Sequence, residues 1–134
     1  MTTWSISEVA EKCGLSQHTL RWYERIGLLG PVVRTSDGRR RFTEHDLEWL
    51  GLINKLRETG MSVKDMQRYA ELARSGTGVQ ERIELFKRHR AEVRRAMAAQ
   101  RECLKLLDYK IDVYSSRIRE AEQHLQDDQA ENAS

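Results

Sequence analysis

A long heptad pattern in the second half of the chain constrains its fold more than any other feature. From Val79 to Leu125, mostly apolar residues recur at alternating steps of four and three over more than six heptads. This spacing puts them on one stripe of a helix and is typical of a coiled coil. The stripe residues that we expect to mediate dimerisation are Ile83, Phe86, Val93, Met97, Leu104, Leu107, Ile111, Tyr114 and Ile118.

The length of this helix calls for a partner. At ~1.5 Å per residue it would extend roughly 70 Å, which is further than the preceding short segments can cover. That length disfavours the alternative of a helix folded back on its own domain. A second copy supplies a matching stripe, so we expect a homodimer. Arg90 and Gln100 interrupt the stripe and are suited to fixing register or orientation. Residues 126–134 are polar, and we expect a disordered tail there.

The start of the chain predicts two short helices joined by a tight turn. Ser5-Ile6-Ser7-Glu8 has the pattern of a capping box, and Gly14 ends the helix that follows. Ser16 then caps a second helix from Gln17 to Ile26. Two such helices form a helix-turn-helix motif, and its second helix is the one that enters the major groove of DNA.

A basic hairpin is expected directly after this motif. Pro31–Arg34 and Arg40–Phe42 are short extended runs, and Asp37-Gly38 between them is a strong hairpin-turn signal. Residues 1–42 hold seven Lys and Arg against four Asp and Glu. This local excess indicates an anionic partner such as a phosphate backbone, although a solvated turn is the alternative. The arginines of this predicted wing are Arg34, Arg39, Arg40 and Arg41.

A second pair of helices completes the first domain. Thr43 with Asp46 begins a third helix that runs to about Thr59, and Ser62 with Asp65 begins a fourth. Residues 75–78 then break the chain. We therefore predict a mainly α protein with a winged helix-turn-helix DNA-binding domain at 1–75 and a coiled-coil dimerisation helix at 79–125.

Other classes of protein lack support in this sequence. It has no Gly-rich phosphate loop, nucleophile motif or metal-ligand cluster, so we expect neither an enzyme nor a bound cofactor or metal. It has no apolar run of the length that a membrane span needs, so we expect none. The two cysteines, Cys13 and Cys103, are far apart, and a reducing cytoplasm is the natural compartment.

Three stretches resemble the MerR family of bacterial regulators: Ser5–Ala10, His18–Leu29 and Asp37–Phe42. The order Arg21-Trp22-Tyr23-Glu24 is the most specific part. Residues 56–61 and 107–111 are similar to the branch with aldehyde-responsive and redox-responsive members. The resemblance implies a homodimer joined by an antiparallel coiled coil. It also implies that each head reads half of an inverted repeat in an overlong promoter spacer, which is bent and untwisted for RNA polymerase.

The recognition helix carries five candidate DNA contacts. Gln17, His18 and Arg21 lie in its N-terminal part, where side chains reach base edges or nearby phosphates. The resemblance implies that Trp22 and Tyr23 approach the DNA backbone, Tyr23 through its hydroxyl. Most family members carry Tyr or Phe where this chain has Trp22, and core packing is the alternative role for that indole.

The wing arginines are expected to bind phosphates or a minor groove. Arg39 and Arg41 share one face of the predicted hairpin, while Arg34 and Arg40 lie elsewhere. By the resemblance, Arg40 aligns best with the wing arginine of the family. Such contacts release counterions and supply affinity more than specificity.

No sensor motif of the related branches is present in the sequence. Paired cysteines like those of metal-sensing relatives are missing near the end of the long helix, and Lys55 stands where the aldehyde-responsive branch has a cysteine. Cys103, flanked by Arg101 and Lys105, is a candidate redox or electrophile sensor, with a small packing residue as the alternative. A small-molecule effector is unidentified; it would fit near the third and fourth helices, the break at 76–78 or the dimer seam.

Two other functions compete with that of a regulator. One is an architectural DNA-bending module without an effector, and the other is a coiled-coil interaction protein. The long heptad pattern favours a site-specific regulator over the first, because symmetric half-site reading requires a stable dimer. The arginine-rich wing is unexplained by the second.

Overall fold

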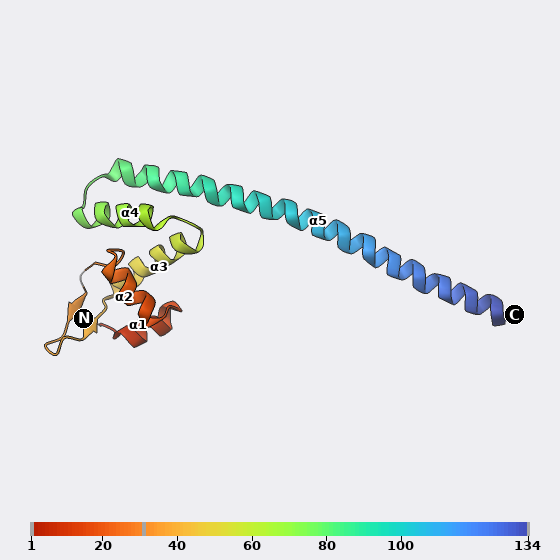
Figure 1. Cartoon of the computed structure of the whole chain (residues 1–134), viewed down its shortest axis with the longest axis horizontal. Coiled ribbons are helices and arrows are strands. Elements are labelled where there is room, and N and C mark those ends of the chain that lie inside the picture. Colours follow the sequence, from red (N-terminus) through yellow and green to blue (C-terminus); the bar gives the residue numbers. More distant parts are fainter. Residues whose placement is uncertain (1, 31, 134) are drawn as a thin grey trace. The chain divides into compact units, whose positions relative to one another are not determined.

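The computed structural model describes residues 2–30 and 32–133 and is mainly helical (Figure 1). It forms two compact units, Met1–Arg90 and Ala91–Ser134, and we describe each by itself. Pro31 of the predicted wing and Ser134 of the predicted tail lie outside the described residues. The elements are α1 (Ile6–Cys13), α2 (Gln17–Arg25), β1 (Val33–Arg34), β2 (Arg40–Arg41), α3 (Glu44–Glu58), α4 (Val63–Ser75) and α5 (Val79–Ala133).

Helix caps set these boundaries as the sequence predicts. The Ser5 hydroxyl accepts the amide of Glu8 at 3.3 Å, and the Glu8 carboxylate accepts the amide of Ser5 at 3.0 Å. Those hydrogen bonds hold the pKa of Glu8 below its ordinary value. Gly14 ends α1 with a positive φ, in the left-handed conformation that only glycine adopts readily. Thr43 and Asp46 form a second capping box at the start of α3.

One hydrophobic core holds the Met1–Arg90 unit together. The N-terminal segment joins it through a bridge in which Trp4 and Phe42 exchange two backbone hydrogen bonds of 2.8 Å. This bridge anchors the base of the wing to the start of the chain. The largest fully buried side chains are Val9, Leu20, Tyr23, Leu28, Leu29, Phe42, Leu50, Ile53 and Met66.

The start of α5 belongs to this core. Leu85 and His89 are buried, and the His89 ring nitrogen lies 2.7 Å from the Thr59 hydroxyl. The Phe86 ring packs on Tyr69 of α4 with centroids 4.6 Å apart. The compact unit therefore extends to Arg90, beyond the boundary predicted at residue 75. Phe86, predicted to lie in the dimer seam, already has a partner in its own unit.

The rest of α5 exposes its apolar stripe. Six predicted seam residues in the Ala91–Ser134 unit are between 46% and 61% exposed: Met97, Leu104, Leu107, Ile111, Tyr114 and Ile118. The helix runs to Ala133 where we expected a disordered tail from residue 126. Residues 126–133 contain neither Gly nor Pro, and Gln123 donates to Asp127 at 3.0 Å, so no stop signal interrupts the helix.

No helix within residues 2–30 and 32–133 combines the length and apolarity needed to cross a membrane.

We predict that Ser5→Ala destabilises the protein by about 0.5–2 kcal/mol, because the first turn of α1 loses its cap. Chemical denaturation at a fixed protein concentration measures this, with Ser36→Ala in the exposed wing turn as the control. The Glu8 arm of the box contributes stability above the ordinary pKa of 4.5, and that contribution is lost as the pH falls through the lowered folded value. Ser5→Ala keeps the backbone amide that Glu8 accepts, so the stability of wild type and of the variant should both fall as the pH drops below about 4.5. An equal loss of stability in Ser36→Ala would contradict the assignment of Ser5 as the stabilising cap of α1.

Candidate nucleic-acid interface

The recognition helix α2 separates packing residues from exposed ones. Ser16 caps it by accepting the amide of Thr19 at 3.0 Å. Leu20 and Tyr23 point into the core, with at most 1% of their surface exposed. Of the remaining side chains, His18 and Arg21 are exposed and Gln17 is half-buried. The predicted base-reading residues thus lie together on the outer face, where Arg21 donates to Gln17 at 3.3 Å.

The wing is a short antiparallel hairpin built by its turn. Val33 pairs with Arg41 and Arg34 pairs with Arg40. Gly38 has a positive φ, as the predicted Asp-Gly turn requires. The Thr35 hydroxyl donates to the Asp37 carboxylate, and this bond lowers the pKa of Asp37.

Glu24 connects the wing to the recognition helix. Its two carboxylate oxygens lie 3.2 Å from Arg34 Nη2 and 2.5 Å from Arg40 Nε. The second contact is an ion pair without the alignment of a hydrogen bond. Because Arg34 and Arg40 are cross-strand partners, one carboxylate holds both strands against α2. The sequence marked these arginines as DNA contacts, and the structure shows that their charge is also used within the protein.

The other two wing arginines differ from each other. Arg41 donates from Nε and Nη2 to the hydroxyl and the carbonyl of Thr3, both at 3.1 Å, so it anchors the N-terminal segment. Arg39 has a side chain that is 85% exposed and lies 3.3 Å from Asp37. Arg39 is therefore the wing arginine that projects furthest into solvent.

Tyr23 and Trp22 both pack against the core. Tyr23 is fully buried in the chain without DNA, so the contact of its hydroxyl with the DNA backbone stays a prediction. Its hydroxyl accepts a hydrogen bond of 3.1 Å from Arg57 Nη1 of α3. Trp22 is half-buried and packs against the core, consistent with the packing alternative.

Arg57 is a candidate contact that the sequence did not reveal. Its guanidinium lies over the rings of Trp22 and Tyr23, at 5.5 and 5.7 Å from their centroids. The contact spans 34 residues in sequence, so no local motif marks it. It places an exposed cation beside the C-terminal half of α2.

The cysteines and metal-ligating residues form no evident sensor. Cys13 is half-buried, and burial raises the pKa of its thiol, which disfavours the reactive thiolate. Cys103 is exposed on α5, so its role as a redox sensor stays a prediction. Among residues 2–30 and 32–133, no three His, Cys, Asp or Glu side chains gather as a metal site.

A helix-turn-helix with a basic wing, followed by a second helix pair, matches known family models. The model of the MerR HTH family regulatory proteins matches residues 4–72, and the model described as MerR, DNA binding, matches residues 47–109. The chain belongs to the MerR family. This confirms the resemblance inferred from its sequence motifs, and with it the mainly α winged helix-turn-helix fold.

Similar MerR proteins cover most of the chain. An uncharacterized HTH-type transcriptional regulator of Haemophilus influenzae is 42% identical over 113 residues, covering 84% of each chain. The crystal structure of HiNmlR, a MerR family regulator lacking the sensor domain and bound to promoter DNA, has a TM-score of 0.79 at 40% identity. That match covers 86% of this chain and 92% of HiNmlR. A putative MerR regulator from Listeria monocytogenes has a TM-score of 0.87 at 36% identity, covering 96% and 98%.

We predict that Glu24→Gln weakens DNA binding by about two- to tenfold, although it removes a negative charge from the DNA-binding domain. Loss of both ion pairs frees the wing from α2, so more of the chain must be ordered on binding. Fluorescence anisotropy with a duplex that the protein binds measures the effect. Glu11→Gln, on the exposed side of α1, is the charge-matched control. If Glu24→Gln tightened binding as much as the control, the wing would not depend on Glu24.

Proposed function

We propose that this protein is a site-specific transcriptional regulator that binds an inverted-repeat promoter site as a homodimer and bends and untwists the spacer DNA. The observation that carries the proposal is the ion-paired unit of recognition helix and wing, which presents Gln17, His18 and Arg21 on one exposed face. The similarity to HiNmlR, which was solved on promoter DNA, supports the same target class.

Different parts of the interface would do different work. Gln17 and Arg21 carry the side-chain groups that recognise adenine and guanine edges, with His18 beside them. Arg39 and Arg57 are exposed cations suited to phosphate, so they would add affinity with little sequence preference. The main role of Arg34, Arg40 and Arg41 would be to position the wing, and contact with the DNA backbone would be their lesser role.

The exposed stripe of α5 supports a homodimer. An unpaired row of apolar side chains over several heptads is costly in water, and a second copy covers it with the same residues. Each dimer then carries two DNA-binding domains, as an inverted repeat requires.

Charge along α5 favours antiparallel pairing. Residues 82–95 hold six Lys and Arg against two Asp and Glu, whereas residues 120–131 hold five Asp and Glu and neither Lys nor Arg. Parallel helices would place like charges together, and antiparallel helices place opposite charges together. In the register that overlaps nearly the whole helix, Leu104 of one copy meets Leu107 of the other. Arg90 then meets Ala121 of the second copy, between two glutamates.

Bending is the step that would connect binding to transcription. Distorting a site of this size costs on the order of 1–6 kcal/mol, so two firmly joined heads are needed to impose it. RNA polymerase would be the partner that uses the realigned promoter. The relatives are regulators and not enzymes, and we propose the same for this chain, in the bacterial cytoplasm.

Selection of random duplex DNA with the purified protein tests the proposal. Recovery of one inverted repeat, bound as a dimer and bent in a circular-permutation gel assay, would support it. Recovery of no shared sequence, with only steeply salt-dependent binding, would favour the architectural DNA-bending alternative.

The double variant Leu104→Glu with Leu107→Glu should be monomeric, because four carboxylates would face one another at the centre of the dimer. Analytical ultracentrifugation checks this, with Leu106→Glu as the matched control. Leu106 is 66% exposed but lies off the stripe, so its variant should remain dimeric. Dissociation by the control alone would place the dimer seam on another face of α5.

Arg39→Ala should weaken binding to all duplexes alike and reduce the slope of log K against log salt by about one. Affinities at several salt concentrations, for the selected site and a scrambled one, give this slope. Arg119→Ala on α5 is the control and should leave it unchanged. A loss confined to the selected site would mean that Arg39 reads bases.

A further inference from the structure

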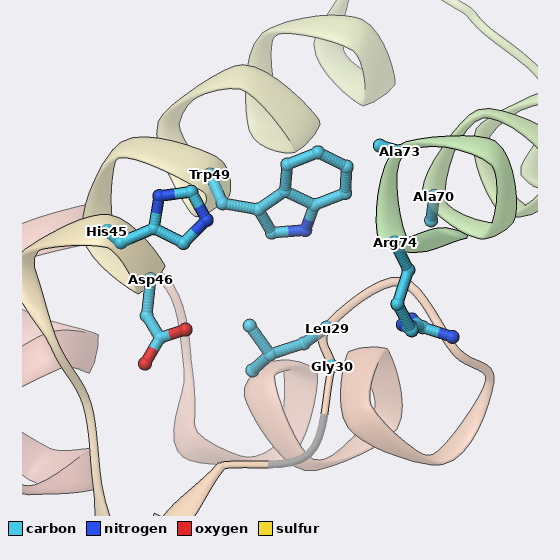
Figure 2. A pocket seen from close by; sticks show the side chains of 8 residues that line it. All are labelled: Leu29, Gly30, His45, Asp46, Trp49, Ala70, Ala73 and Arg74. Carbon is cyan, nitrogen blue, oxygen red and sulfur yellow. The ribbon is translucent and has the colours of Figure 1, made fainter. Parts of the chain in front are cut away.

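A cavity of about 240 Å³ lies within the Met1–Arg90 unit, between α3, α4 and the segment after α2 (Figure 2). Trp49 and Leu29 form its apolar body together with Ala70 and Ala73. Its polar groups lie on two opposite sides, with His45 and Asp46 of α3 on one and Arg74 of α4 on the other. The cavity is thus apolar in the middle and charged at both ends.

The walls of this cavity also hold the connection between the recognition helix and the wing. Three consecutive carbonyls, those of residues 26–28, each accept a hydrogen bond from a side chain of α3 or α4. Gln67 donates to Ile26 at 2.8 Å, Arg74 to Gly27 at 3.0 Å and Trp49 to Leu28 at 2.6 Å. Arg74 and Trp49 therefore have two roles: each lines the cavity and each fixes the path of the chain directly after α2.

The Arg74 guanidinium has capacity for an anion. It carries five N–H donors in a planar fork, which suits a carboxylate. One nitrogen donates to the Gly27 carbonyl, and the side chain has no carboxylate partner among residues 2–30 and 32–133. The residue as a whole is exposed at the rim of the cavity, so a ligand can reach it.

The end of the cavity opposite Arg74 has hydrogen-bond acceptors, and the Trp49 ring forms a flat wall in the middle. One oxygen of Asp46 accepts the Thr43 amide at 2.9 Å, which leaves carboxylate lone pairs for a ligand donor. The Trp49 indole stacks on Tyr69 with centroids 5.5 Å apart and an angle of 13° between the planes, so its position is fixed before any ligand arrives. A planar ring fits such a wall better than a branched chain.

We propose that this cavity binds a small aromatic carboxylate that carries a hydroxyl or amine at the far end of its ring. The carboxylate would bind Arg74, the ring would lie against Trp49 and Leu29, and the far donor would reach Asp46 or His45. The volume is adequate, since a dry protein cavity of about 150 Å³ already admits benzene.

Binding would act on DNA affinity, a consequence that rests on the proposed function. A carboxylate on the remaining donors of Arg74 would share the guanidinium with the Gly27 carbonyl, and so would change how firmly the segment after the recognition helix is held. Because coupling is reciprocal, the ligand would change the affinity for DNA by the factor by which DNA changes the affinity for the ligand.

Isothermal titration of the full chain with 4-hydroxybenzoate tests the site. We expect saturable binding of one molecule per chain, with phenol, which lacks the carboxylate, at least about tenfold weaker. Arg74→Gln should weaken binding by about tenfold or more. Arg68→Gln on the same helix, whose side chain pairs with Glu81, should leave it unchanged. Ala73→Leu, which fills the cavity and keeps Arg74, should abolish binding; circular dichroism confirms that each variant is folded.

Three results would overturn the site: no saturable binding of 4-hydroxybenzoate or 4-aminobenzoate up to about 10 mM, equal binding by Arg74→Gln, or equal binding by Ala73→Leu. Anisotropy of a selected DNA duplex with and without the probe then tests the coupling. DNA binding without ligand binding would reject the site and leave the proposed function standing. Ligand binding without binding to any preferred DNA sequence would support the site and reject the proposed function.

Discussion

The carboxylate of Glu24 is the point on which the geometry of the DNA-binding surface depends. A two-stranded hairpin as short as β1 and β2 has little stability of its own. Its turn fixes the local conformation, and the bridge between Trp4 and Phe42 fixes its base. Its position relative to α2 is set by the ion pairs of Arg34 and Arg40 with one partly buried acid. Helix and wing therefore form one preformed surface.

Local chemistry explains why much of this fold was predictable. Ser5, Ser16 and Thr43 cap helices because their hydroxyls reach backbone amides a few residues away, and Gly38 turns the hairpin because of its own conformational freedom. Signals of this kind lie within a few residues of one another and can be read directly from the sequence. These local signals predicted the order of the helices, the wing and the long C-terminal helix.

The features that the sequence did not reveal depend mostly on contacts between distant segments. The sequence of α2 does not show that Arg57 of α3 donates a hydrogen bond to the Tyr23 hydroxyl. The burial of Tyr23 therefore could not be predicted from the sequence. Heptad spacing shows that Phe86 needs an apolar neighbour without showing that Tyr69 supplies it. The polar residues after Leu125 suggested disorder, yet they include no helix breaker. The cavity beside Trp49 has no sequence signature, because its walls come from three separate segments.

The separation of packing residues from exposed residues on α2 affects how regulators of this kind can diverge. Leu20 and Tyr23 bind the helix to the core, whereas His18 and Arg21 project away from it and pack against little. Substitutions at the outward positions should change which operator is preferred at almost no cost in folding free energy. A duplicated gene could therefore acquire a new set of promoters before anything in its scaffold had to change.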